Sequence, residues 1–323
     1  MKESPKSKDP LELLRDSLQD RFGIDFVTIS SEVKAIPRIS TGIIALDKAL
    51  GGGVAVGRFS ELFGKASSGK STIVLAIMVQ AQKAFPDREV LYVDAEHALD
   101  LEWAAKLGIN MDKFNYARPE TAEQGFLVIE EFLKTDKTSV IALDSVPASV
   151  PKVALEGEIG EANIGLQARI IAQCLPRIGT RMAQLKDPPA LLLINQKRAN
   201  LQSRGGFQGY EPVKSTGGMA LPFYMTTRLD VARIGTIKDS LDDEIGQEVL
   251  VHVVKHKITP GPGAKITFRI DNRIGIDTLQ ELLDLGLADG SITKSGSWFI
   301  VSSGEKLQGE EKTKKWIAEH RKE

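Results

Sequence analysis

Residues Gly64-Lys65-Ala66-Ser67-Ser68-Gly69-Lys70-Ser71 match the phosphate-binding loop pattern G-x-x-x-x-G-K-[ST] at every fixed position. An apolar segment at residues 59–63 precedes the loop, and an apolar run without Gly or Pro follows it at residues 72–79. This pattern predicts a strand, the loop and then a helix, which is the context that the motif requires. A Gly/Ser turn that matches by chance is the alternative, and the flanking segments weigh against it.

The loop residues predict that the chain binds a nucleotide with Mg²⁺. Glycines allow backbone N–H groups to face phosphates, and the start of the helix adds a partial positive charge. We expect Lys70 to neutralise the β- and γ-phosphate oxygens and the Ser71 hydroxyl to bind the metal. The residues expected around the nucleotide are Gly64, Ser67, Ser68, Gly69, Lys70, Ser71 and Thr72.

Composition places the chain among globular proteins. Of its 323 residues, 42% are hydrophobic and 26% charged, and the formal net charge is −1. This balance excludes a general polyanion-binding surface but permits a local basic segment. The single cysteine, Cys174, excludes an intrachain disulfide and a cysteine-based zinc site, and it favours a reducing compartment. We expect a cytoplasmic protein without a membrane partner, because no segment resembles a secretory core or a membrane span.

Two further predicted strands are followed by acidic residues. Residues 89–94 lead to Glu96, and the apolar residues 140–143 end in Asp144. In open parallel sheets, ligands bind beyond the carboxyl ends of the strands. Glu96 could therefore hold and deprotonate a water, and Asp144 could hold Mg²⁺ directly or through water. A solvated strand-end carboxylate is the alternative for Glu96, and many parallel strands end in Asp.

Periodicity predicts the other elements and the domain organisation. The pattern indicates an α/β fold with a mostly parallel central sheet, a small N-terminal helix-strand arm and a small α+β C-terminal lobe. We expect the arm at residues 1–35, the core at 36–272 and the lobe at 273–323. The arm packs either on its own core or on a neighbouring subunit. Helices are expected at residues 11–22, 43–50, 101–107, 120–134, through Cys174, from Leu279 and at 312–323, and strands at 24–29, 190–194, 225–234, 248–254, 265–270 (an edge strand) and 298–301.

The composition changes at residues 197–218, which we call the basic segment. It combines lysines and arginines with glycines and two aromatic residues, and Glu211 is its one acidic residue. Single-stranded nucleic acid requires cations, flexibility and aromatic groups together, whereas an ordinary surface loop is the alternative. Gln196 precedes the segment at a strand end, so a γ-phosphate could order one end while DNA orders the rest. Its net positive charge predicts a salt slope of about −2 per subunit, from about −0.7 per neutralised phosphate.

Several strings resemble the RecA family of recombinases, in order and at matching spacing over nearly the whole chain from about residue 38. Two of them, Asp94-Ala95-Glu96-His97-Ala98-Leu99-Asp100 and Gly157-Glu158-Ile159-Gly160, are specific to that family, whereas many ATPases share the phosphate loop. The other matching strings are Ile39-Ser40-Thr41-Gly42, Ala49-Leu50-Gly51, Asn195-Gln196, Thr216-Gly217-Gly218, Arg228-Leu229-Asp230, Val253-Val254-Lys255 and Lys257-Ile258.

The resemblance implies an ATP-dependent recombinase of homologous recombination and DNA repair. Its subunits would form a helical filament on single-stranded DNA, pair it with homologous double-stranded DNA and exchange strands while hydrolysing ATP. A repressor of the DNA-damage (SOS) response is a further candidate partner. The alternatives are an ATP-binding regulatory protein of the same fold without strand exchange, and a hexameric helicase. The basic segment weighs against the first, and the family-specific strings give the second no support.

The resemblance also assigns roles by position. Lys70 and Ser71 hold phosphate and Mg²⁺, Glu96 activates water, and Asp144 supports the metal through water. Gln196 senses the γ-phosphate, and Asp100 and Trp103 contact adenine. Spacing alone would make Lys255 and Lys257 a solvated strand end, but they match lysines that reach the neighbour's ATP. The expected DNA-binding residues are Gly157, Glu158, Ile159, Gly160, Gly165 and Arg169 in and after a first loop, and Lys197, Arg198, Arg204, Phe207, Lys214, Gly217 and Gly218 in the second.

The sequence also departs from the family pattern. Trp103 replaces a tyrosine and should preserve stacking on adenine. Asn272 stands where an aromatic second base contact is expected, which weakens one face of the adenine site. Pro176 replaces a basic residue and is expected to interrupt its helix. The N-terminal helix and Phe223 match subunit contacts, and the absence of an acidic tail after Glu323 predicts easier entry onto duplex DNA.

Overall fold

The structure is a computed structural model that describes residues 9–22, 35–157, 165–197, 218, 220–239, 241–258 and 262–320. The chain divides into two units, Met1–Pro37 and Arg38–Glu323. In the first unit, helix α1 spans Pro10–Phe22 and begins at a proline, whose missing N–H costs no hydrogen bond there. The helix predicted from sequence is confirmed, and none of its residues is buried. The strand predicted at residues 24–29 lies outside the described residues.

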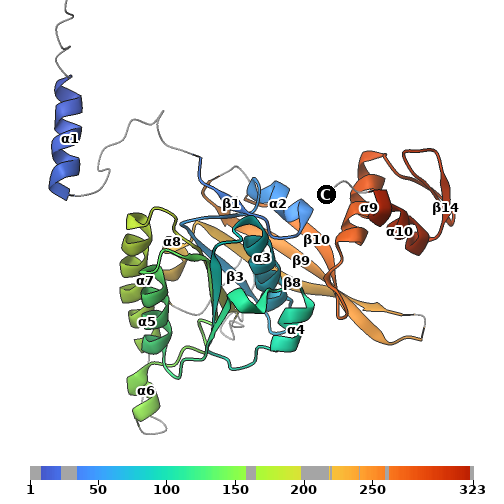
Figure 1. Ribbon diagram of the computed structural model, residues 1–323. Coiled ribbons are helices and arrows are strands. Elements are labelled where there is room, and N and C mark those ends of the chain that lie inside the picture. Colours follow the sequence, from blue (N-terminus) through green and yellow to red (C-terminus); the bar gives the residue numbers. More distant parts are fainter. Residues whose placement is uncertain are drawn as a thin grey trace, which may run out of the picture. The chain divides into compact units, whose positions relative to one another are not determined.

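Within the described residues, the second unit is organised by a nine-stranded sheet of order β11-β10-β9-β8-β3-β7-β6-β4-β5 (Figure 1). From β8 to β5 every neighbouring pair is parallel, and β9, β10 and β11 continue the sheet in antiparallel fashion. The predicted α/β class with a mostly parallel central sheet is confirmed. The strands are β3 (Phe59–Gly64), β4 (Glu89–Asp94), β5 (Phe114–Ala117), β6 (Thr138–Asp144), β7 (Ala190–Gln196), β8 (Thr227–Lys238), β9 (Glu244–His256), β10 (Lys265–Asp271) and β11 (Gly275–Ile276).

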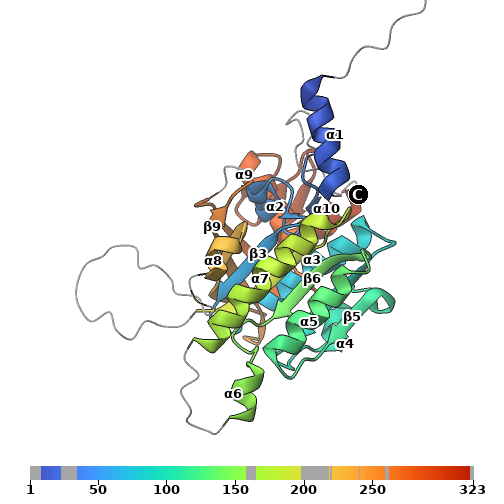
Figure 2. The ribbon, with the colours of Figure 1, turned by 90° about the vertical axis from the view of Figure 1, so that its left-hand side faces the viewer.

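Helices cover both faces of this sheet (Figure 2). In β6, Val140 and Ala142 pack into one core and Ile141 and Leu143 into the other, because successive side chains of a strand point to opposite faces. Burial on both faces is typical of parallel strands. The first core is covered by α2 (Ile44–Leu50), α3 (Lys70–Ala84) and α4 (Leu101–Lys106), and the second by α5 (Ala122–Leu133), α7 (Leu166–Gln184) and α8 (Ala220–Tyr224).

A separate small core lies in the C-terminal part of this unit. Its buried residues include Leu283 of α9, Phe299 of β13 and Ile317 of α10. The α+β character predicted for this part, with its two helices and the strand near Trp298, is confirmed. The elements are α9 (Thr278–Asp289), α10 (Glu310–His320) and the antiparallel strands β12 (Thr293–Ser295), β13 (Trp298–Ile300) and β14 (Lys306–Gln308). Short elements elsewhere are the pair β1 (Arg38–Ile39) and β2 (Val54–Ala55), helix α6 (Lys152–Glu156) and the 3-10 helix Met111–Lys113.

Among the differences from the expectations, three concern the central sheet and helix α7. Strand β5 at the sheet edge was not predicted, because four partly buried residues carry too short a pattern. Strand β10 was predicted as an edge strand, and within the described residues it has no outer partner over Lys265–Arg269, but β11 pairs with Ile270 and Asp271 at its end. Helix α7 continues through Pro176, so the predicted interruption is wrong. A proline removes one helical hydrogen bond, and this 19-residue helix also buries Ile171, Leu175, Ile178 and Met182.

Glu281 of α9 connects the C-terminal part of this unit to α2. The side chain is buried, and its carboxylate oxygens accept hydrogen bonds from the backbone N–H of Ile44 at 3.0 Å and of Ala45 at 2.7 Å. These N–H groups lie at the start of α2, and the N-cap residue Ile43 offers no side-chain acceptor. The carboxylate therefore caps the helix and faces its positive end.

We expect Glu281→Ala to lower the free energy of unfolding by about 2–4 kcal/mol, because two partly buried N–H groups lose their acceptor at about 1–3 kcal/mol each. Urea unfolding would measure the loss. Glu281→Gln keeps one acceptor oxygen and should lose less. Glu319→Ala, which removes an exposed glutamate of α10, is the control and should change stability by at most about 0.5 kcal/mol. Equal effects of Glu281→Ala and Glu319→Ala would contradict the capping role.

Candidate nucleotide-binding site

The phosphate loop joins β3 to α3, as the motif predicted. Every residue of β3 is buried, so the sheet holds the strand end from which the loop leaves. Ser67 and Gly69 adopt positive φ values of 56° and 94°. A Cβ atom on Gly64 would lie 2.0 Å from the carbonyl oxygen of Val231, so glycine is required at this close approach. The close contact of β8 with the loop therefore depends on this glycine.

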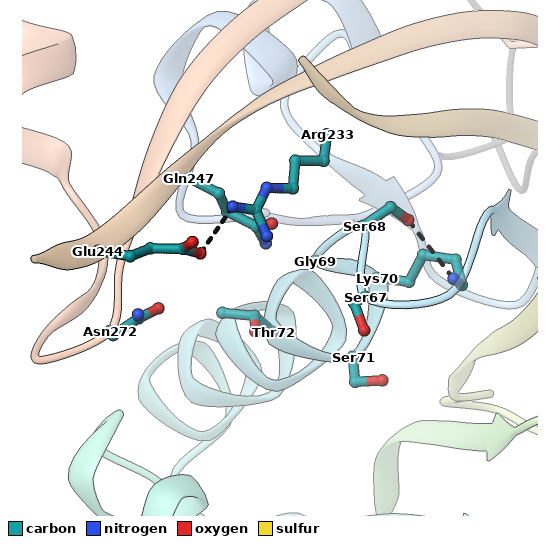
Figure 3. A pocket seen from close by; sticks show the side chains of 10 residues that line it. All are labelled: Ser67, Ser68, Gly69, Lys70, Ser71, Thr72, Arg233, Glu244, Gln247 and Asn272. Carbon is teal, nitrogen blue, oxygen red and sulfur yellow. Dashed lines mark hydrogen bonds and ion pairs between the residues drawn. The ribbon is translucent and has the colours of Figure 1, made fainter. Parts of the chain in front are cut away.

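Lys70, the first residue of α3, is held by the loop that precedes it. Its side chain is 7% exposed, and Nζ donates hydrogen bonds to the Lys65 carbonyl oxygen at 2.7 Å and to Ser68 Oγ at 3.4 Å (Figure 3). Burial lowers the pKa of Lys70, while the charges of Asp144 and Glu96 raise it. A cation beside the first N–H groups of a helix is an arrangement suited to phosphate.

The two residues expected to support Mg²⁺ are in contact. Ser71 Oγ donates a hydrogen bond to Asp144 Oδ2 at 2.7 Å, and the Tyr92 hydroxyl donates to the same oxygen at 2.5 Å. Burial raises the pKa of Asp144, and the two hydrogen bonds lower it. Among the described residues, no group of three or more His, Cys, Asp or Glu could hold a metal alone. These oxygen donors fit a Mg²⁺ ion that takes its remaining ligands from water and phosphates.

Tyr92→Phe removes one of the two hydroxyl donors to Asp144 Oδ2. We expect the Mg²⁺ concentration for half-maximal binding of a fluorescent ADP analogue to rise by about 3–10-fold. A hydrogen bond to a charged group contributes about 1.5–3 kcal/mol, and the remaining hydroxyl donor, Ser71, compensates for part of that loss. Tyr116→Phe is the matched control, since the Tyr116 hydroxyl donates to Asp94 Oδ2 at 2.8 Å. A Mg²⁺ requirement equal in both variants would exclude a specific role for Tyr92.

Glu96 links three strand ends. Its Oε1 accepts hydrogen bonds from Ser145 Oγ at 2.5 Å and from Gln196 Nε2 at 3.0 Å. Ser145 follows β6, and Gln196 is the last residue of β7, where it pairs with Gly64 of β3. Parallel pairing brings the carboxyl ends of these strands to the same edge of the sheet. Glu96 and Gln196, predicted separately from sequence, are therefore in direct contact.

Two cavities share Ser71 and Thr72. One of about 330 Å³ is lined by loop residues and by Arg233, Glu244, Gln247 and Asn272 (Figure 3). The other, of about 180 Å³, contains Glu96, Asp100, Trp103 and Asp144 in its lining. All predicted nucleotide-binding residues except Gly64 line one cavity or the other. Gly64 is the last residue of β3, and it packs against the Val231 carbonyl oxygen of β8 instead.

The two residues expected at adenine also shape α4. Asp100 Oδ1 accepts a hydrogen bond from the Trp103 backbone N–H at 3.0 Å and so caps the helix. Trp103 packs partly buried against the core, and Lys106 Nζ lies 5.8 Å from its ring centroid. Asn272 lines the other cavity. Their roles toward a base stay predictions.

Lys255 and Lys257 lie at the carboxyl end of β9. Lys255 Nζ donates to the Pro222 carbonyl oxygen at 2.5 Å. Burial lowers the pKa of Lys255, and the nearby charges of Lys257 and Arg228 lower it further. Their expected reach toward the ATP of a neighbouring subunit stays a prediction.

Part of the predicted DNA-binding set is described. Gly157 directly follows α6, Gly165 precedes α7 with a φ of 80°, Arg169 lies in the first turn of α7, and Lys197 follows β7. Gly218 is also described, with a φ of 74°. The predicted residues Glu158, Ile159, Gly160, Arg198, Arg204, Phe207, Lys214 and Gly217 lie outside the described residues.

Sequence reasoning missed four residues at this site. Tyr92 was hidden in an apolar strand, although a tyrosine two residues before a strand-end Asp could have indicated a hydroxyl near the metal. Arg233, Glu244 and Gln247 come from β8 and β9, far along the chain from the loop. Arg233 Nη2 and Glu244 Oε1 form an ion pair at 2.6 Å (Figure 3). No local pattern indicated that this hairpin borders the phosphate loop.

Comparison with known proteins gives consistent matches. The family model of the RecA N-terminal domain matches residues 12–277, and that of the RecA C-terminal domain matches residues 280–323. Protein RecA of Pseudomonas putida is 40% identical over 291 residues, which are 90% of this chain and 79% of that protein. Protein RecA of Syntrophobacter fumaroxidans is 41% identical over 287 residues, or 88% and 80% of the two chains. The mitochondrial DNA repair protein recA homolog of Dictyostelium discoideum is 40% identical over 296 residues, or 91% and 62%.

Among the described helices, none has the length and apolar character needed to cross a bilayer.

The matches to the two domain models and to the relatives confirm the resemblance seen in the sequence strings. Because the two domain models together cover most of its length and its relatives carry the same name, the chain belongs to the RecA family of recombination and DNA repair proteins.

Proposed function

We propose that this protein is a DNA-dependent ATPase that forms filaments on single-stranded DNA, pairs them with homologous duplex and exchanges strands. The observation that carries the proposal is the hydrogen bond from Gln196 Nε2 to Glu96 Oε1 at 3.0 Å. It connects the residue expected to activate water to the residue that directly precedes the basic segment. Nucleotide state and DNA binding would therefore share one contact.

ATP and Mg²⁺ are the proposed ligands. Lys70 and the loop N–H groups would hold the phosphates, and Ser71 and Asp144 would support the metal, Asp144 through water. Mg²⁺ would neutralise charge on the phosphates. Glu96 would orient and deprotonate the attacking water, with Ser145 and Gln196 fixing its carboxylate. Asp100 and Trp103 would contact adenine.

Assembly is the second part of the proposal. We assign residues 1–35 to a polymerisation arm, 36–272 to the ATPase core and 273–323 to a C-terminal lobe. Helix α1 has no buried residue, and Phe223 is 75% exposed, which supports their use in subunit contacts. Lys255 and Lys257 would stabilise phosphate charge on the ATP of the next subunit, so that hydrolysis requires assembly. We further propose that the protein acts in the cytoplasm and that it contacts a repressor of the DNA-damage response.

The test is ATP turnover with and without single-stranded DNA, with electron microscopy of the same samples. We expect DNA to stimulate turnover and open helical filaments to form. Binding of ATP without DNA stimulation would instead support a regulatory protein of the same fold. Closed rings would support a helicase.

A further inference from the structure

Lys197 is the last described residue before residues 198–217, and it is anchored at both its backbone and its side chain. Its N–H donates to the Gly64 carbonyl oxygen at 3.1 Å. Its Nζ forms an ion pair with Asp230 Oδ2 of β8 at 2.5 Å. The basic segment therefore starts from a residue fixed to both β3 and β8.

The Lys197–Asp230 pair is partly shielded from solvent. The two side chains are 26% and 17% exposed. Within the described part of the chain, Asp230 Oδ1 is buried and has no hydrogen-bond partner. Partly buried charges are screened less by salt, and removing one member of such a pair leaves the other uncompensated. Asp230 thus depends on Lys197 for its charge balance.

A second ion pair lies beside the first. Arg228 Nε pairs with the fully buried Glu61 at 2.5 Å, and Asn195 Nδ2 donates to the other oxygen of Glu61 at 2.8 Å. Arg228 Cζ lies 4.7 Å and Lys197 Nζ 5.7 Å from the centroid of the Phe63 ring, which is a cation–π distance. The Lys197 ammonium therefore belongs to an ordered set of contacts among β3, the end of β7 and the first residues of β8.

From this geometry we infer that Lys197 is a positioning residue that fixes the start of the basic segment by pairing with Asp230, and is not a ligand of the DNA backbone. This inference refines the proposed DNA binding and rests on it. Gln196 and Lys197 are adjacent, and they contact Glu96 and Asp230 respectively. The ion pair with Asp230 therefore holds the chain to the sheet at the residue where the basic segment begins.

Salt dependence separates positioning from direct binding. The assay is binding of a fluorescent oligo(dT) with a non-hydrolysable ATP analogue over a salt series. If Lys197 only positions the segment, Lys197→Met and Asp230→Asn should both weaken binding by the same factor, about 3–10-fold, without changing the slope. The double variant should be no weaker than either single variant. Arg198→Gln is the matched control, and its slope should become shallower by about 0.7 for one lost phosphate contact.

Direct binding predicts opposite signs for the two variants. Lys197→Met would then lose about 0.7 of slope, and Asp230→Asn would tighten binding because it releases the lysine. Either result would overturn the inference. Failure of the unsubstituted protein to bind oligo(dT) would instead refute the proposed function.

Limited trypsin digestion tests the same anchor without DNA. We expect Lys197→Met and Asp230→Asn to increase the rate of cleavage after Arg204 by a similar factor, because the segment loses its fixed start. Lys65→Met, at an exposed lysine of the phosphate loop, is the control and should leave that rate unchanged. Equal cleavage rates in all four proteins would also overturn the inference.

Discussion

Lys70→Ala is expected to weaken ATP binding by about two orders of magnitude and to abolish ATP-dependent filament formation. The ammonium is buried, lies in the loop and contacts Lys65 and Ser68 through hydrogen bonds. A hydrogen bond between charged groups contributes about 1.5–3 kcal/mol, and alanine removes every donor of the ammonium at once. Binding of a fluorescent ATP analogue and electron microscopy with single-stranded DNA would measure the two effects.

Lys65→Ala is the matched control for this experiment. Lys65 is exposed in the same loop and contributes its carbonyl oxygen to the Lys70 contact, which alanine preserves. We expect its ATP affinity to stay within about twofold of the unsubstituted protein. Full ATP turnover on DNA by the Lys70→Ala protein would refute the assignment of the loop.

Glu96→Gln is expected to lower kcat by about 10²–10⁴-fold while ATP affinity changes little. An amide cannot take a proton from water, and general base catalysis contributes about that factor. The substitution preserves the shape of the side chain and an oxygen that can accept from Ser145 or Gln196. Steady-state turnover with single-stranded DNA, together with equilibrium binding of an ATP analogue, separates the chemical step from binding.

Glu102→Gln makes the same chemical change at an exposed position of α4 and should leave kcat unaltered. A Glu96→Gln protein with turnover within twofold of the unsubstituted protein would show that another group activates the water. Loss of ATP binding in this variant would mean that Glu96 supports the fold of the cavity instead.

The strand, loop and helix around Lys70 could be predicted because all their determinants are local. The motif specifies where glycine is needed, and the apolar runs before and after it mark the flanking elements. Local patterns likewise located β4, β6 and β7, each of which precedes or contains a predicted site residue. Two of these residues, Glu96 and Gln196, then proved to be in contact.

Local sequence patterns failed to predict the structure where it depends on contacts with residues distant in the chain. Strand β5 is too short to carry a pattern, and the last two residues of β10 are covered because the chain turns back as β11 to pair with them. Pro176 has a strong intrinsic tendency to end a helix, yet the packing of α7 on the sheet retains it. In each case tertiary contacts outweigh a local preference.

The amino-acid sequence by itself determined the class of the fold, the phosphate loop and the acidic strand ends, because these depend on residues close together in the chain. Only the tertiary structure decided that Tyr92 meets Asp144, that Glu281 caps α2 and that Lys197 pairs with Asp230. These partners are separated by 52, 236 and 33 residues. Their meeting follows from strand order and helix packing, which no periodicity within a single segment contains.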